Sequence, residues 1–247
     1  MANDRQSRHH RPRQARRVLV TGASSGIGTA LVREIAARGD VVLCTGRRAA
    51  AALPADFPDV AYLQADLARA EGRDALLSWA DGPLDCAILN AGAGHYRPIS
   101  AEDDADIDAV IATNLVAPVM LAHGLFSALS TGQGRLALVG SVAFRGAAGM
   151  PVYAASKAAL DGFGRALASE WRGRVTVRVL HPGPTATGMA ARAGRPVDWV
   201  ERIMLPPGAV ARTMLRQLER GSGGYRSVVS YPQVALHALM HSRRQRR

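Results

Sequence analysis

The amino-acid sequence predicts one α/β domain, a doubly wound parallel β-sheet of about seven strands with helices on both faces. Two observations lead to this fold class. Short, nearly continuous apolar runs alternate with helical patterns along the chain, and such runs are typical of parallel strands that are covered on both sides. In addition, the 247 residues are 48% hydrophobic and 21% charged, so a sizeable core is available.

The elements are expected in the following order. RVLV at 17–20 is the first strand, and TALVREIAARG at 29–39 is an amphipathic helix that stops at Gly39. β-branched and apolar residues predict the other strands, at 41–45, 60–65, 84–92, 135–141, 175–183 and 226–230. The other helices are expected at 68–80, 102–114, 117–130, 152–172 and 207–220. We interpret the acidic run at 102–108 as a helix start, with carboxylates at the positive end of the helix dipole, and not as a metal site.

The net charge of +11 is concentrated at the two ends of the chain. Residues 1–17 carry +5 and residues 241–247 carry +4, which leaves only +2 on the other 223 residues. Because both ends are poor in apolar residues, we predict a disordered basic arm at 1–16, a single domain at 17–240 and a disordered basic tail at 241–247. We interpret these ends as solvated, with weak non-specific contacts to nucleic acid as the alternative.

The cysteines and the apolar runs predict where the protein works. Cys44 and Cys86 lie in strand-like runs without CxxC spacing, which predicts buried free thiols in a reducing cytoplasm. No apolar stretch approaches the roughly 18 residues of a membrane helix, so no membrane partner is expected. The basic start of the chain is followed by VLV and then at once by TGASSGIG, which lacks the apolar core of an export signal. We therefore expect a cytoplasmic protein.

The first candidate site is the stretch TGASSGIG at 21–28, between the first strand and the first helix. Gly22 permits a tight turn, Gly26 a close approach of the backbone, and Gly28 close packing of helix on strand. The helix N-terminus offers free N–H groups and a positive dipole to a diphosphate. Such turns often serve geometry alone, but this one lies where a parallel sheet binds ligands. We therefore predict dinucleotide binding by Gly22, Ser24, Ser25, Gly26, Ile27 and Gly28.

The end of the second strand predicts which dinucleotide binds. Twenty residues beyond Gly26, where an acidic residue would bind a ribose 2′-hydroxyl, the chain has Gly46, followed by Arg47 and Arg48. Two guanidiniums in place of a carboxylate suit a 2′-phosphate. We therefore predict NADP(H) as the cofactor in preference to NAD(H). The alternative is that the two arginines belong to an ordinary solvated helix start.

The only lysine of the chain, Lys157, lies four residues after Tyr153. On a helix, this spacing puts both side chains on one face. With the glycine-rich loop, Asn-Ala-Gly at 90–92 and YAASK at 153–157 in this order, the sequence resembles the classical short-chain dehydrogenase/reductase family from about residue 17 to about residue 220. The resemblance implies a Rossmann-type fold and hydride transfer between a nicotinamide and a ketone or aldehyde.

The resemblance also implies four catalytic residues. Tyr153 is the general acid/base, and Lys157 also binds the nicotinamide ribose. Ser141 binds the substrate oxygen, and Asn114 holds a water in the proton relay. Because a free tyrosine has a pKa of about 10, we expect the Lys157 ammonium and the cationic nicotinamide to lower the pKa of Tyr153. Ser141 lies twelve residues before Tyr153; the family loop is commonly one residue longer, so a shortened loop is expected here.

The same resemblance implies further cofactor contacts. Asp66 accepts a hydrogen bond from the adenine amino group, with a helix cap as its alternative role, and His181 is interpreted as a strand-end residue and not as a proton carrier. The remaining expected cofactor residues, from the ends of the third, fourth and sixth strands, are Leu67, Asn90, Ala91, Gly92, Pro182, Gly183, Thr185 and Thr187.

The substrate is expected to be a small carbonyl compound or alcohol, bound by 93–98, 142–150 and about 188–206. Arg97, Arg145, Arg192 and Arg195 lie in these segments and would suit an acidic group on the substrate. No metal is expected.

The helix at 152–172 carries the small residues Ala158, Gly162, Gly164, Ala166 and Ala168. In the family this helix commonly packs against its twin, which implies a homodimer or homotetramer; packing on the chain's own sheet is the alternative. The competing function is a non-catalytic nicotinamide sensor whose basic tails contact nucleic acid. The set of Ser141, Tyr153, Lys157 and Asn114 favours the enzyme, since a sensor would not need it.

Overall fold

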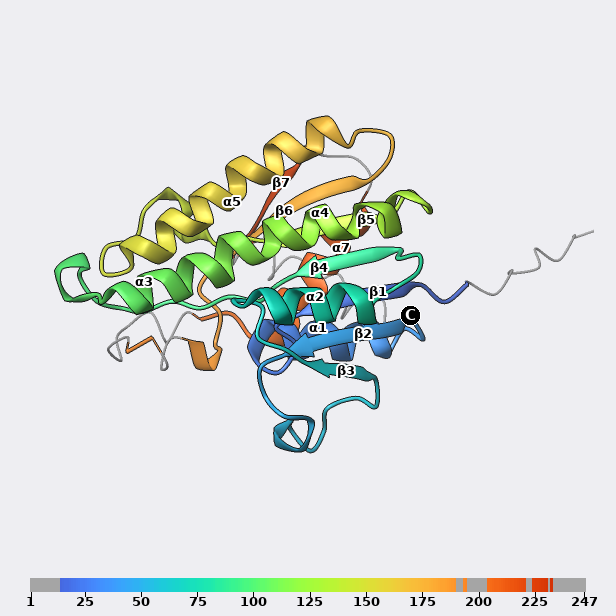
Figure 1. The fold of residues 1–247 in the computed structure, drawn as a ribbon, viewed down its shortest axis with the longest axis horizontal. Helices are drawn as coiled ribbons and strands as arrows, with labels where there is room; N and C mark the ends of the chain where they lie inside the picture. The colour runs from blue at the N-terminus through green and yellow to red at the C-terminus, as the bar shows by residue number, and fades with distance from the viewer. Residues whose placement is uncertain (1–13, 190–192, 195–203, 221–223, 231, 233–247) are drawn as a thin grey trace, which may run out of the picture.

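The structure, a computed structural model, describes residues 14–189, 193–194, 204–220, 224–230 and 232. These residues form one parallel sheet in the order β3-β2-β1-β4-β5-β6-β7 (Figure 1). The direction of winding reverses between β1 and β4, so the doubly wound Rossmann-type sheet is confirmed. The strands are β1 (Arg17–Thr21), β2 (Val41–Gly46), β3 (Ala61–Gln64), β4 (Cys86–Leu89), β5 (Arg135–Val139), β6 (Thr176–Pro182) and β7 (Arg226–Val229).

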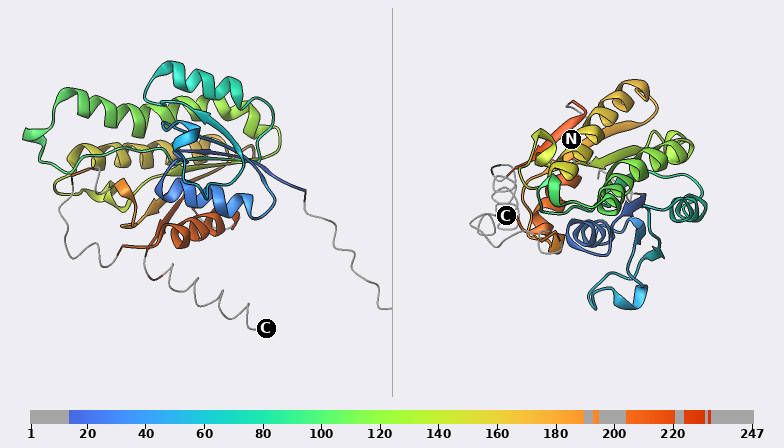
Figure 2. Two further views of the ribbon diagram at one scale, coloured as in Figure 1. Left: turned by 90° about the horizontal axis from the view of Figure 1, so that it is seen from below. Right: turned by 60° about the vertical axis from the view of Figure 1, so that its left-hand side comes forward.

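Helices cover both faces of the sheet, each over its own apolar cluster (Figure 2). α1 (Gly26–Ala36) and α7 (Pro207–Glu219) pack on one face, and α2 (Ala70–Trp79), α4 (Ala117–Ser130) and α5 (Pro151–Glu170) pack on the other. Neighbouring residues of β1 serve opposite faces: Val18 and Val20 join the first cluster, and Leu19 joins the second. Both faces are therefore buried, which explains why the strands are apolar without alternation.

The ends of several elements differ from the prediction. α1 begins at Gly26 and not at 29, because the glycine-rich loop itself supplies the first helical turn. β4 ends at Leu89 and not at 92, because the backbone N–H of Asn90 donates to the Thr21 hydroxyl oxygen (3.0 Å) and so leaves the strand pairing. α5 begins with Pro151 at its first position, where the fixed φ of proline suits a helix and no N–H is needed.

The predicted helices at 102–114 and 117–130 form one continuous helix. α3 (Asp104–Ile111) and α4 are joined by the π-helical segment η3 (Ala112–Val116). The acidic run starts this helix as predicted, since Asp103 Oδ1 accepts a hydrogen bond from the Asp106 N–H (2.7 Å).

The joined helix corrects one expectation about membrane length. It has 27 residues, Asp104–Ser130, and an 18-residue window within it has a mean hydropathy of 1.7, so the helix is long and apolar enough to cross a membrane by length and composition alone. The prediction that no apolar stretch approaches this length is wrong, because the break expected after residue 114 is only a π-helical turn. Leu121, Leu125 and Leu129 of the same helix pack in the core against the sheet, and core helices satisfy the same length and composition test.

The start of the domain lies one residue earlier than predicted. Arg16 was assigned to a disordered arm, but its backbone N–H donates to Asp40 Oδ1 (3.0 Å) and its guanidinium pairs with Asp40 Oδ2 (2.8 Å). The rest of the predicted arm up to residue 13, and the whole tail at 241–247, lie outside the described residues.

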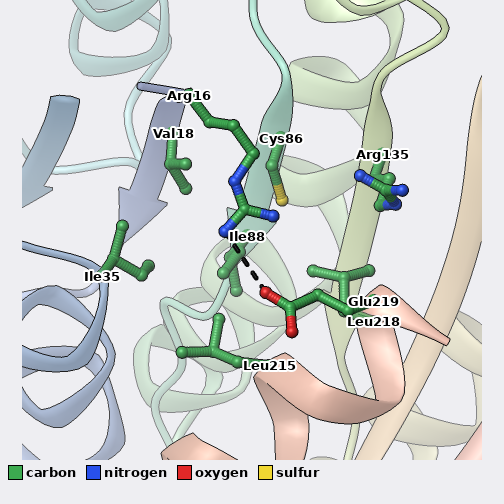
Figure 3. A pocket seen from close by; sticks show the side chains of 9 residues that line it. All are labelled: Arg16, Val18, Ile35, Cys86, Ile88, Arg135, Leu215, Leu218 and Glu219. Carbon is green, nitrogen blue, oxygen red and sulfur yellow. Dashed lines mark hydrogen bonds and ion pairs between the residues drawn. The ribbon is translucent and has the colours of Figure 1, made fainter. Parts of the chain in front are cut away.

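The amino ends of the strands surround a small cavity, and Arg16 and Glu219 form an ion pair across it (Figure 3). Cys86 lines this cavity. Cys86 and Cys44 are both buried free thiols, as predicted, and burial raises the pKa of each to about 12. The cavity lies at the amino ends of the strands, whereas the predicted site lies at their carboxyl ends.

Candidate active site

The glycine-rich loop follows β1 at the carboxyl edge of the sheet. Gly22 and Gly26 have φ values of +67° and +58°, a region that side chains disfavour. A Cβ on Gly28 would lie 2.0 Å from the Gly22 carbonyl oxygen. Ser25 is the N-cap of α1, and its side chain makes no capping hydrogen bond within the described chain. The first N–H groups of α1 therefore face the loop without a side-chain cap, which fits a diphosphate.

Asn90 ties the loop after β4 to the glycine-rich loop. Its Nδ2 donates to the carbonyl oxygens of Thr21 (3.1 Å) and Gly22 (3.3 Å). The Thr21 hydroxyl oxygen also accepts from the Ala91 N–H (3.0 Å). The side chain of Asn90 thus holds the phosphate-binding loop in shape, while Ala91 and Gly92 follow it along the same edge.

β2 ends at Gly46 beside this loop, and Arg47 and Arg48 follow it. A Cβ on Gly46 would lie 2.7 Å from Ser24 Oγ and 2.9 Å from the Tyr62 hydroxyl oxygen, so an acidic side chain there would have to displace Ser24 or Tyr62. Arg47 and Arg48 are exposed, and neither pairs with a carboxylate in the part of the chain that the structure describes. Their carbonyl oxygens accept from Gln64 Nε2 (3.1 Å) and the Tyr62 hydroxyl (2.7 Å), which fixes the backbone and leaves both guanidiniums available.

Asp66 and Leu67 follow β3. Asp66 Oδ1 accepts from the Ala68 N–H (3.1 Å) and so caps the turn after β3. The alternative role as a helix cap is wrong, because α2 begins at Ala70 with Arg69 as its N-cap. Leu67 is buried in the core and so anchors this turn.

The loop after β6 crosses above the glycine-rich loop. A Cβ on Gly26 would lie 2.8 Å from Thr187 Cγ2, so Thr187 sits directly over the start of α1. Thr185 donates its hydroxyl to the Gly183 carbonyl (2.9 Å), and the Gly183 N–H donates to the Val229 carbonyl at the end of β7 (3.0 Å). The structure therefore brings the predicted cofactor residues of this loop to the same place as those of the first loop.

Ser141, Tyr153 and Lys157 meet at the carboxyl end of β5. The Ser141 and Tyr153 side chains are hydrogen-bonded, so the short loop does bring Ser141 to Tyr153. The Lys157 ammonium lies 5.7 Å from the Tyr153 ring centroid, and it donates to the Val139 carbonyl at 2.8 Å. Lys157 is 3% exposed. The pair predicted from a four-residue spacing thus forms one cluster with Ser141, in which Lys157 is buried and Ser141 and Tyr153 are half-buried.

The pKa shifts in this cluster differ from the expectation. Burial raises the pKa of Tyr153, and the hydrogen bond with Ser141 offsets only part of that rise. The expected lowering by Lys157 is therefore not found in the protein alone. Burial lowers the pKa of Lys157 itself to about 8, because a cation in an apolar surrounding is disfavoured. The protein by itself keeps Tyr153 protonated, which suits a proton donor.

Asn114 lies in the π-helical segment η3 and is fully buried. Its Oδ1 accepts from the Ala93 N–H (2.8 Å), and its Nδ2 donates to the Ala93 carbonyl (2.8 Å) and to Ser156 Oγ (3.0 Å). The Asn114 side chain therefore fixes the loop after β4 against α5 at Ser156, three residues after Tyr153 and one before Lys157.

On the substrate side, the structure describes only part of the predicted segments. A Cβ on Gly94 would lie 2.9 Å from the Tyr153 ring, so the predicted substrate segment 93–98 borders Tyr153 at Gly94. Arg97 pairs with Asp106 (3.0 Å), which weakens the case for Arg97 as a site for an acidic substrate. Arg145 is exposed, and Arg192 and Arg195 lie outside the described residues.

Two residues near the site were not predicted to act there. His181 lies at the end of β6, as the sequence predicts; in addition, it is fully buried and contacts the Ser141 backbone and Asp161. Asp161 continues the four-residue spacing of Tyr153 and Lys157, and this spacing was the signal in the sequence that could have identified it.

The comparisons with known proteins agree with this geometry. A family model described as short chain dehydrogenase matches residues 16–197. The chain belongs to the short-chain dehydrogenase family. This short-chain dehydrogenase is 32% identical to an uncharacterized oxidoreductase of Mycobacterium tuberculosis over 241 residues, which cover 91% of this chain and 92% of the relative.

Two further relatives concern activity and cofactor. The L-xylo-3-hexulose reductase of Hypocrea jecorina is 33% identical over 221 residues, which cover 76% of this chain and 72% of that protein. The solved short-chain dehydrogenase of Sphingobium yanoikuyae in complex with NADPH is 26% identical, with a TM-score of 0.80 over 93% of this chain and 94% of that chain. This chain is therefore an oxidoreductase of a family in which a solved member binds a nicotinamide cofactor.

Proposed function

We propose that this short-chain dehydrogenase uses NADP(H) to interconvert a ketone or aldehyde and an alcohol, with Tyr153 as the general acid/base. The observation that carries the proposal is the cluster of half-buried Ser141 and Tyr153 with buried Lys157, at the same end of the sheet as the glycine-rich loop. A protein that only senses nicotinamide has no need of this cluster, so the sensor with nucleic-acid-binding tails is not favoured.

The residues of the chain have separate tasks in this reaction. When bound, the cofactor supplies or accepts the hydride at the carbonyl carbon. The Tyr153 hydroxyl, protonated at neutral pH, gives its proton to the carbonyl oxygen as that oxygen gains negative charge. The Ser141 hydroxyl donates a hydrogen bond to the same oxygen. The Lys157 ammonium then stabilises the tyrosine anion that is left, through its charge.

Three features support NADP(H) in preference to NAD(H). Gly46 stands where an acidic residue would bind a 2′-hydroxyl, and Ser24 and Tyr62 fill the space that such a side chain would need. Arg47 and Arg48 are exposed beside it, with geometry suited to a 2′-phosphate. In addition, the Sphingobium relative was solved with NADPH.

The cofactor preference predicts the result of removing the two arginines. NADPH titration followed by nicotinamide fluorescence should show that Arg47→Ala/Arg48→Ala weakens NADPH binding about tenfold to a hundredfold, because two charge-assisted hydrogen bonds are lost. NADH binding should change less than about threefold. Arg172→Ala/Arg174→Ala removes the same charge from the turn after α5 and is the control. Equal loss for both cofactors, or no loss, would contradict the assignment.

The reaction class is tested with carbonyl probes. Oxidation of NADPH by the full chain would be followed with phenanthrenequinone, a hexulose and an acetoacetyl thioester as separate substrates. Turnover of one of them that falls about a hundredfold in Ser141→Ala, with measurable residual activity, supports the proposal. Cofactor binding with no turnover of any carbonyl or alcohol would favour a binding protein.

A homo-oligomer is the second part of the proposal, and it rests on exposed small residues of α5. Ala155, Ala158, Gly162 and Ala166 are exposed along one stripe, and no atom lies within 4 Å of a Cβ built on Gly162. By contrast, a Cβ on Gly164 would lie 2.2 Å from Val179, so that glycine serves packing on the chain's own sheet. Val116 and Met120 of the neighbouring η3 and α4 are also exposed, at 39% and 47%, and would extend an apolar contact with a second copy.

If α5 forms the contact between copies, a larger side chain at Gly162 should disrupt the oligomer without unfolding the monomer. Gly162→Trp should convert the assembly to monomers in light scattering after size exclusion, while the unfolding midpoint of the monomer stays within about 3 °C because the new side chain meets open space. Gly132→Trp, in the turn after α4, also meets open space and should leave the assembly unchanged. A monomeric wild-type protein would refute this part of the proposal.

A further inference from the structure

A buried chain of hydrogen bonds lies beneath Ser141 and is separate from the catalytic set described above. His181, on β6, is fully buried. Its Nδ1 lies 3.2 Å from the Ser141 backbone nitrogen and 3.0 Å from the Ser141 carbonyl oxygen. Its Nε2 lies 2.9 Å from Asp161 Oδ1. One imidazole thus joins the Ser141 peptide to helix α5.

Asp161 also contacts Arg226 and Tyr225, at the start of β7. Arg226 Nε donates to Asp161 Oδ1 (2.8 Å), a second Arg226 nitrogen contacts Oδ2, and the Tyr225 hydroxyl lies 3.4 Å from Oδ2. Burial acts to raise the pKa of Asp161, but hydrogen bonds from Arg226 and His181 outweigh it and keep the pKa below its usual value. Asp161 is therefore a carboxylate, and it accepts the proton on His181 Nε2.

With Nε2 protonated, the other ring nitrogen faces the Ser141 peptide in either charge state of the ring. In the neutral ring, Nδ1 accepts from the Ser141 N–H; in the charged ring, an Nδ1–H donates to the Ser141 carbonyl. Both atoms lie within hydrogen-bond distance. The peptide that carries the catalytic hydroxyl is thus held whichever state the histidine adopts.

The surroundings hold the His181 ring in this position. A Cβ on Gly140 would lie 2.5 Å from His181 Nδ1, so the close approach of ring and strand depends on glycine at 140. On the other side, the Phe144 ring packs on the imidazole with centroids 4.2 Å apart. The ring therefore has little freedom to move away from Ser141.

Ser141 is connected to α5 at two positions, Tyr153 and Asp161. Tyr153, Lys157 and Asp161 follow one another at four-residue spacing on α5 and share one face of that helix. Ser141 is hydrogen-bonded to Tyr153 at the first of these positions, and it is linked through His181 to Asp161 at the last. Two points of the same helix thus fix Ser141.

We propose that His181, oriented by Asp161, is a positioning residue that holds the Ser141 peptide and so sets the Ser141 hydroxyl against Tyr153. This inference rests on the proposed function of Ser141 and Tyr153. It also explains how a loop with only eleven residues between Ser141 and Tyr153 keeps the serine in place: the clamp acts on the strand side of Ser141 and does not depend on loop length.

Three substitutions at residue 181 distinguish the roles of the two ring nitrogens, Nδ1 and Nε2. An asparagine amide lies where Nδ1 lies and can bond the Ser141 peptide, whereas a glutamine amide lies where Nε2 lies and can bond Asp161. Leucine can do neither. With NADPH and phenanthrenequinone, His181→Leu and His181→Gln should lower turnover about tenfold to a hundredfold, because a displacement of about 1 Å is enough for such a loss. His181→Asn should stay within about threefold of wild type, and NADPH affinity should change less than about twofold in all three.

A double substitution tests whether His181 acts through Ser141. In a Ser141→Ala background the hydroxyl is already gone, so adding His181→Leu should lower turnover by less than about a further twofold. A merely structural role would instead multiply the two losses. Equal losses in His181→Asn and His181→Leu, or full multiplication in the double variant, would overturn the proposal.

Amide hydrogen exchange tests the clamp without any substrate. Exchange of the Ser141 N–H should be at least about tenfold faster in His181→Leu than in wild type and unchanged within about threefold in His181→Asn. Unaltered exchange in a folded His181→Leu protein would overturn the clamp. If wild type reduces no carbonyl while the exchange pattern is as expected, the proposed function fails and the clamp stands, so the two failures are distinguishable. Should His181→Leu not fold, the contrast between His181→Gln and His181→Asn decides the same question.

Discussion

Replacing Tyr153 with phenylalanine is expected to lower turnover at least about a hundredfold while NADPH affinity stays within about twofold. The substitution removes only the hydroxyl, which gives the proton to the carbonyl oxygen. The ring remains, and with it the packing against Gly94 and the cation–π contact with Lys157. The stability of the fold should change by less than about 1 kcal/mol, since one buried hydrogen bond is lost.

Steady-state turnover, nicotinamide fluorescence and thermal unfolding of Tyr153→Phe together decide this prediction. Loss of turnover with retained cofactor binding and an unchanged unfolding midpoint assigns the loss to the proton donor. Near-normal turnover in a folded variant would remove Tyr153 from the mechanism and leave Ser141 and Lys157 without a reacting partner.

Replacing Lys157 with methionine is expected to abolish most of the activity and, at the same time, to stabilise the fold. The lysine is buried, and burial lowers its pKa from 10.5 to about 8. At neutral pH the folded chain therefore holds an ammonium in an apolar surrounding at a cost of up to about 3 kcal/mol. Methionine has a similar length and no charge. It loses the hydrogen bond to the Val139 carbonyl, which offsets about 1 kcal/mol of the gain.

The sign of the pH dependence follows from the direction of the pKa shift. Between pH 8 and 10.5 the unfolded chain still carries the proton on Lys157 and the folded chain has lost it. Wild-type stability therefore rises with pH across this window relative to the variant. The stability difference between Lys157→Met and wild type should be largest at neutral pH and should shrink toward zero above pH 10.5.

Urea unfolding of the two proteins at pH 7 and pH 10 measures this difference, and other titrating groups cancel because both proteins share them. A variant that is less stable than wild type at pH 7, or a difference that does not change with pH, would mean that Lys157 is not a buried ammonium. Lys157→Met would then lose activity without gaining stability.

The order of the elements, the doubly wound sheet and the positions of the candidate catalytic residues along the chain could all be predicted from the sequence. Continuous apolar strands require helices on both faces, and the four-residue spacing of Tyr153 and Lys157 puts them on one helix face in any context. Gly22, Gly26 and Gly28 were predictable because a tight strand-to-helix turn demands them, and the structure confirms this with positive φ at two of the three positions.

Features that depend on contacts between distant segments could not be predicted from the sequence and became visible in the folded chain. The raised pKa of Tyr153 follows from burial by surrounding elements, not from its neighbour Lys157. The hydrogen bonds of the Asn90 side chain to the glycine-rich loop form because β4 lies beside β1. The clamp of Ser141 by His181 and Asp161 joins residues 40 and 20 positions apart, and no local periodicity records such a contact. Spacing along one element is fixed by backbone geometry, whereas burial and cross-element hydrogen bonds exist only once the sheet has brought its carboxyl ends together.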